Sequence, residues 1–163
     1  MKNFIKITDQ DGLIYFDQFE ENELYVYKNQ NNTLTFNIDI RSIMRWQMQD
    51  RIPQLEKDLG EKLNEDIRFV YVELREFETK ITSLNEITDL EIKIPKGYEI
   101  DPQMDSIACV YFGWDIELNN NIIQFTKDNQ NLIVNWKASS DDVNYYDERA
   151  KDSGFQTQCA LNI

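Results

Sequence analysis

The sequence predicts a mostly β to α+β fold, with an antiparallel sheet or sandwich-like core and one short inserted helix near residues 53–64. Three observations predict it. Most apolar stretches alternate with period two, which places alternate side chains on opposite faces of a strand. Asn-rich turn segments separate several of these stretches, and only one stretch has helical period. No internal repeat or Pro- and Gly-rich hinge interrupts the chain, so residues 1–163 are expected to form one globular domain.

The clearest predicted strand covers residues 33–40, where polar and apolar side chains alternate without a break. Residues 24–27 form the strand before it. The connection between them, residues 28–32, is rich in Asn, which tolerates the left-handed backbone of tight turns. We therefore expect a hairpin. Residues 17–23 form a second acidic patch with no basic residue and a lone Phe19. The patch either adds to a binding surface or is only a solvated loop, and Phe19 is expected to be a core anchor and not an interface residue.

The single helical pattern is the recurrence of Leu55, Leu59 and Leu63 at every fourth residue, behind Pro53. Proline suits the first helical turn because its missing N–H would be unpaired there in any case. Gly60 inside the pattern is less favourable than alanine by about 1 kcal/mol, so the helix is expected to be short. Residues 41–51 fit the spacing of a strand and of a helix equally well, and both alternatives remain open.

Three stretches are apolar on both parities, as expected of central strands that are covered on two sides. They are residues 67–77, 107–112 and 132–136. Two further stretches alternate and should have one solvated face; these are residues 90–94 and 155–163.

A short meander is predicted around residues 122–125, because Asn-rich segments at 119–121 and 127–131 flank this stretch as turns. Successive strands are expected to pair with one another.

The chain is strongly acidic, with 30 Asp and Glu against 17 Lys and Arg and a formal net charge of -13. This charge repels phosphate backbones and anionic lipids, so direct binding to nucleic acid or membrane is not expected. The same field attracts a basic protein. The plain alternative is that acidity only keeps the chain soluble. Neither a signal-peptide pattern nor an apolar run of about 18 residues is present, so a cytoplasmic location is expected.

The sequence lacks the residues and motifs of several common catalytic and metal sites. The chain contains no His, the usual general base of Ser and Cys nucleophiles and the commonest zinc ligand. It also lacks a Gly-rich phosphate loop and a Cys-x-x-Cys pair. We therefore predict no catalytic residue, metal site or cofactor. Cys109 and Cys159 are expected to be reduced, buried thiols with structural roles.

The most unusual stretch, residues 141–148, combines four carboxylates with two adjacent tyrosines. It lacks the spacing of a calcium-binding EF-hand loop. As a plain connection it would tuck a tyrosine against the sheet. As a binding surface, its tyrosines would supply contact area and its carboxylates would pair with a partner's Lys or Arg. The predicted partner-binding residues are Asp141, Asp142, Tyr145, Tyr146, Asp147 and Glu148.

Two other classes of function stay open. One is a carboxylate enzyme that acts on carbohydrate or a carbohydrate-binding domain, since a pair of Asp or Glu suffices for glycoside hydrolysis and Trp114 beside Asp115 could stack on a sugar. The other is an acidic mimic of nucleic acid, which would need a continuous stripe of carboxylates.

In overall character the sequence resembles the immunity proteins that bacteria make against polymorphic or contact-dependent toxins. It shares with them its small size, its strong acidity, its richness in Asn, Lys, Asp and Ile, and the absence of a catalytic motif. The resemblance implies a non-enzymatic inhibitor that occludes the basic active site of a nuclease-like toxin. Charge would speed capture, and buried aromatic side chains would slow release.

Overall fold

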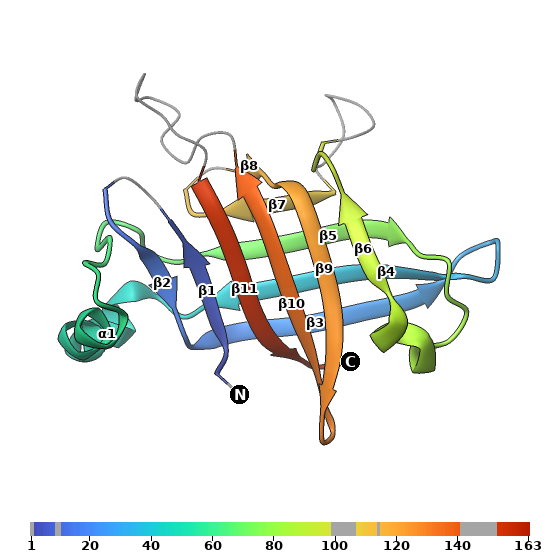
Figure 1. Cartoon of the computed structure of the whole chain (residues 1–163), viewed down its shortest axis with the longest axis horizontal. Coiled ribbons are helices and arrows are strands. Elements are labelled where there is room, and N and C mark those ends of the chain that lie inside the picture. The colour runs from blue at the N-terminus through green and yellow to red at the C-terminus, as the bar shows by residue number, and fades with distance from the viewer. Residues whose placement is uncertain (1, 9–10, 99–106, 114, 141–152) are drawn as a thin grey trace.

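Two antiparallel β-sheets pack face to face in the computed structural model of the chain, and their strands run in clearly different directions (Figure 1). The structure describes residues 2–8, 11–98, 107–113, 115–140 and 153–163. The strands are β1 (Phe4–Ile7), β2 (Ile14–Phe16), β3 (Phe19–Lys28), β4 (Leu34–Ser42), β5 (Tyr71–Glu78), β6 (Glu91–Ile94), β7 (Ala108–Tyr111), β8 (Asp115–Glu117), β9 (Asn119–Asp128), β10 (Asn131–Ser140) and β11 (Ser153–Leu161). The helices are the 3-10 helix η1 (Arg45–Arg51), α1 (Ile52–Leu59) and the 3-10 helix η2 (Leu84–Asp89).

The six-stranded sheet has the order β2-β1-β11-β10-β9-β6, and the five-stranded sheet has the order β3-β4-β5-β7-β8. Most pairs join strands that follow one another in the chain, as predicted. The pairs β1–β11, β5–β7 and β6–β9 instead join strands with other elements between them. The mostly β fold with a sandwich-like core is therefore confirmed.

The core lies between the two sheets and is built from the inward side chains of both. Phe36 of the five-stranded sheet meets Phe125 of the six-stranded sheet edge to face, with ring centroids 6.0 Å apart. Trp136 is the largest fully buried side chain, and its ring packs edge to face against Phe155. Edge-to-face contact suits the charge distribution of aromatic rings.

A buried polar contact supports Trp136. Its indole N–H donates to the side-chain oxygen of Asn121 at 2.8 Å. The amide nitrogen of Asn121 donates in turn to the carbonyl oxygens of Ile94, at 3.0 Å, and Leu118. Asn121 therefore forms hydrogen bonds with buried groups of three residues, and such a network is stable only when its members are all satisfied.

The β3–β4 hairpin is confirmed. The side-chain oxygen of Asn29 accepts hydrogen bonds from the backbone N–H groups of Asn31 and Thr33, and Asn32 adopts a left-handed φ of 63°. The solvated loop predicted over residues 17–23 is wrong, because β3 begins at Phe19 and pairs with β4. Asp17, just before it, is buried and forms an ion pair with Arg51 at 2.7 Å.

The predicted helix is present but shorter than residues 53–64. It ends at Leu59 because Gly60 adopts a left-handed φ of 72° and caps it. Leu63 lies beyond the helix and forms a β-bridge with Leu13. The ambiguous segment 41–51 divides between the end of β4 and η1.

In η1, Arg45 is buried. Its guanidinium lies 4.1 Å from the centroid of Phe16 and donates to two backbone carbonyls, those of Tyr15 and Asn64.

Other boundaries differ from the prediction. Residues 119–121, predicted as a turn, belong to β9, and β9 pairs with β10 up to a bulge near Ser139. The strand predicted over residues 67–77 begins only at Tyr71. The short strands β1, β2 and β8 were not predicted. Among the described helices, none is long and apolar enough to span a bilayer.

We predict that Asn121→Leu lowers the free energy of unfolding by roughly 2 to 4 kcal/mol, because it leaves the Trp136 N–H and two carbonyls buried without partners. Chemical denaturation measures the change. Asn135→Leu, on the solvent side of the same sheet, is the control and should change stability by less than about 0.5 kcal/mol. Equal losses in the two variants would contradict the role assigned to Asn121.

Candidate functional site

The outer face of the five-stranded sheet gathers carboxylates and tyrosines, and we call it the acidic face. It arises because the alternate residues of these strands point into the core, as in β4, where Phe36, Ile38 and Ile40 are fully buried. Its residues are Glu21, Glu23, Tyr25, Tyr27, Thr35, Asn37, Asp39, Arg41, Tyr71, Glu73, Arg75, Glu78, Cys109, Tyr111, Asp115 and Glu117.

A row of acidic residues crosses the acidic face. The strand register places Glu23 opposite Asp39, and Asp39 opposite Glu73. It continues from Glu73 to Cys109 and from Cys109 to Glu117. Side chains directly opposite one another on neighbouring strands lie about 5 Å apart, so like charges in these positions destabilise a sheet. The fold therefore holds three carboxylates side by side at a cost in stability.

Cations neutralise only part of this row. Arg75 forms an ion pair with Glu73, in which Nε donates to one carboxylate oxygen at 2.9 Å and Nη2 donates to the other at 2.6 Å. Within the part of the chain that the structure describes, no ion pair reaches Glu21, Glu23 or Asp39. The part of the acidic face formed by Glu21, Glu23 and Asp39 therefore carries negative charge that no ion pair offsets among the described residues.

The pKa of Asp39 reflects these surroundings. Burial raises the pKa of its carboxyl group, a hydrogen bond with Tyr71 opposes the rise, and the charges of Glu21 and Glu73 add to it. The pKa of the Tyr71 hydroxyl is raised as well, by burial and then by the charges of Asp39 and Glu73. The surroundings of Asp39 therefore disfavour the ionised form of its carboxyl group.

Two exposed tyrosines of the acidic face lie on β3, the edge strand of the five-stranded sheet. The side chain of Tyr25 is 48% exposed and that of Tyr27 is 42% exposed. The pKa of Tyr25 is raised by burial and by the charges of Glu21, Asp39 and Glu23, in that order. Tyr25 follows Glu23 on the same side of β3. The hydroxyl of Tyr27 donates to Glu76.

Arg41, on the acidic face, contacts both an aromatic ring and a carboxylate. The guanidinium of Arg41 lies 5.1 Å from the centroid of Phe69, and its Nε is 3.7 Å from a carboxylate oxygen of Glu20. Arg41 also stands in a second row across the sheet, opposite Glu21 on one side and Tyr71 on the other.

The outer face of the six-stranded sheet differs in charge. Its solvent-facing side chains are mostly amides, hydroxyls and lysines, such as Gln124, Asn135, Lys137 and Gln156. Glu91 there is paired with Lys93 at 2.7 Å. Among the residues that the structure describes, a row of carboxylates lies on the outer face of the five-stranded sheet and not on that of the six-stranded sheet.

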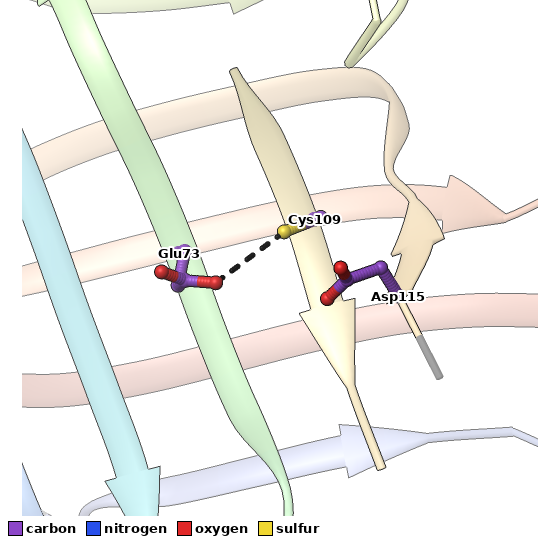
Figure 2. A group of neighbouring side chains, drawn as sticks. All are labelled: Glu73, Cys109 and Asp115. Atoms are coloured by element: carbon purple, nitrogen blue, oxygen red, sulfur yellow. Dashed lines mark hydrogen bonds between the residues drawn. The ribbon is translucent and has the colours of Figure 1, made fainter. Parts of the chain in front are cut away.

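Three potential metal ligands meet on the acidic face. The ligand atoms of Glu73, Cys109 and Asp115, which come from β5, β7 and β8, all lie within 4.8 Å of one another (Figure 2). A thiolate and two carboxylates could hold Zn²⁺. However, both oxygens of Glu73 already accept hydrogen bonds from Arg75, and one also lies 3.7 Å from the thiol of Cys109. The cluster is therefore explained by an ion pair and a thiol–carboxylate contact.

The predicted partner-binding residues, 141–148, lie outside the described residues, and so does Trp114. Of the acidic face, only the acidic patch at residues 17–23 was noted from the sequence, although a signal for more of it exists. From Glu23 to Tyr27 in β3 and from Thr35 to Arg41 in β4, outward positions alternate with apolar inward ones. Assigning faces to residues 21–27 and 35–41 would have grouped the acidic and tyrosine side chains of β3 with Asp39. The pairing with β5 and β7 comes only from the structure.

Comparison of the chain with protein-family models, with curated proteins and with solved structures found no match.

We predict that Asp39→Asn stabilises the protein at pH 7 by a few tenths to about 1 kcal/mol, because it removes a like charge from the row and can still accept from Tyr71. The raised pKa of Asp39 means that the folded state binds its proton more tightly than the unfolded state. The wild type therefore recovers stability relative to the variant as the pH falls from about 7 to about 4. Urea denaturation at several pH values measures this difference.

The control is Glu61→Gln, an exposed position just beyond α1. A destabilised Asp39→Asn protein at neutral pH, or a difference from wild type that does not vary with pH, would contradict the electrostatic account of the row.

Both cysteines should be unreactive in the folded protein. Cys109 and Cys159 are buried thiols with no exposed surface, and burial raises the pKa of Cys159 to about 12. Because the thiolate is the reactive form, a thiol reagent should label neither residue until denaturant unfolds the chain. Stoichiometric labelling of the native protein at neutral pH would show that one of these sites is open.

Proposed function

We propose that this protein is a non-catalytic binding protein whose acidic face covers a basic surface on another protein. The observation that carries the proposal is the row formed by Glu23, Asp39 and Glu73, with cations for only part of it. Local features that oppose stability concentrate at functional sites in real proteins. A basic partner would supply the missing cations and remove the repulsion.

The tyrosines support the same proposal. Tyr25 and Tyr27 expose large, fairly rigid rings beside these carboxylates. Tyrosine and arginine contacts dominate the energetics of many protein interfaces, whereas a purely solvated acidic surface has no need of aromatic rings. The net charge of -13 would steer a basic partner toward the protein and make association sensitive to salt.

The specific form of the proposal is an immunity protein that occludes the basic active site of a nuclease-like toxin. The overall character of the sequence supports this form. A broad sheet face crossed by a row of carboxylates suits the coverage of a cleft that normally holds phosphates.

The row of carboxylates also favours a second candidate, an acidic mimic of nucleic acid. The row supplies part of the required stripe, but Arg75 neutralises Glu73 and Cys109 interrupts the acidic positions before Glu117. The two candidates differ in the partner. Duplex nucleic acid would compete for the partner in both cases, so the identity of the captured partner, a nuclease-like toxin or another nucleic-acid-binding protein, distinguishes the two candidates.

The test is affinity capture with the wild-type protein and two doubly substituted variants that lose the same charge. Glu23→Gln with Asp39→Asn alters the acidic face. Glu61→Gln with Asp89→Asn alters exposed positions beyond α1 and in η2. We expect the wild type and the control to retain a basic protein at low salt and lose it at high salt. The acidic-face variant should bind that protein roughly 100-fold more weakly or worse, since two lost charge-assisted contacts at about 1.5 kcal/mol each amount to about 3 kcal/mol.

Equal retention by the acidic-face variant would contradict the site. If Tyr145→Ala with Tyr146→Ala abolished binding instead, the site would move to residues 141–148.

A further inference from the structure

We infer that the acidic face selects arginine over lysine in its partner, with Tyr25 as the stacking ring and Glu23 and Asp39 as the paired carboxylates. This inference rests on the proposed function and names the chemistry that the partner presents. The occupant is an arginine-bearing surface of a basic protein.

The acidic face binds its own cations through contacts that suit a guanidinium group. Both cations within the acidic face are arginines. Arg75 donates to the two oxygens of Glu73 from two nitrogens, Nε to Oε1 at 2.9 Å and Nη2 to Oε2 at 2.6 Å. Arg41 lies 5.1 Å from the ring of Phe69 with a carboxylate of Glu20 at 3.7 Å. Each contact uses a property of the planar guanidinium that an ammonium group lacks, either paired donors or a stacking surface.

Glu23, Tyr25 and Asp39 provide the same kinds of group, carboxylates and an aromatic ring, but no cation is paired with them among the described residues. Glu23 and Asp39 are directly opposite each other on β3 and β4. Tyr25 follows two residues after Glu23, on the same side of β3, and is 48% exposed. Cross-strand neighbours lie about 5 Å apart, and residues two apart along a strand lie about 7 Å apart. Ring and carboxylates are therefore within reach of one long side chain.

Arginine and lysine differ in the chemistry of their cations. A guanidinium can stack on the Tyr25 ring while its edge donates to Glu23 or Asp39, so it makes both contacts at once. An ammonium is compact and strongly hydrated, and it would satisfy a carboxylate but lose hydration to contact the ring. Charge alone attracts both residues equally, so the preference arises from the tyrosine.

The experiment uses two synthetic peptides of one length and spacing, one with arginine and one with lysine at every basic position. Isothermal titration calorimetry at low ionic strength measures the Kd of each for the full chain. We expect the arginine peptide to bind roughly 3- to 10-fold more tightly. Tyr25→Phe should keep the preference because the ring remains. Tyr25→Leu should abolish it while leaving salt-sensitive binding of both peptides.

Trp46→Leu is the matched control, because it removes a ring that is 68% exposed on η1, outside the acidic face. It should leave the preference unchanged, and loss of the preference in this variant would overturn the assignment to Tyr25. Equal binding of the two peptides would overturn arginine selection and leave the proposed function standing. Failure of both peptides to bind, or binding unaffected by Glu23→Gln with Asp39→Asn, would overturn the inference and the proposed function together.

Discussion

Glu23, Asp39 and Glu73 face one another because the opposite sides of their strands are committed to the core. Leu24, Ile38 and Val72 point inward beside them and are buried. A shift of the register by one residue would expose these apolar side chains and bury the charges, so the packing of the two sheets maintains the repulsive row. The rest of the acidic face follows from this constraint, including the raised pKa of Asp39 and the raised pKa of Tyr25.

The structure distributes its polar groups in two contrasting ways. In the core, polar groups such as those of Asn121 and Trp136 satisfy one another, and the fold depends on them. On the acidic face, carboxylates lie close together with few cations, and stability would improve without them. In the described part of the chain, such carboxylates line one outer face and not the other, so the groups that oppose stability lie apart from the polar groups on which the fold depends.

Sequence patterns predicted the fold class and the β3–β4 hairpin from alternation, and the strands within residues 67–77, 107–112 and 132–136 from their apolar content. Each of these signals lies within one stretch. They missed β1, β2 and β8, which have only three or four residues; β6 is equally short, but its alternation is followed by Pro95, which marks its end. Residues 119–121 were taken as a turn because Asn favours turns, whereas the burial of Asn121 against Trp136 decides their conformation. Most of the acidic face was missed because its members come from strands far apart in the chain, and only the pairing brings them together.

The central claim is that partners bind the outer face of the five-stranded sheet. Amide chemical-shift mapping by NMR during titration with an arginine-rich basic peptide tests it most directly. The account predicts shifts concentrated in β3, β4 and β5, with little change in β9, β10 and β11. Shifts confined to the six-stranded sheet, or to residues 141–152 alone, would contradict it.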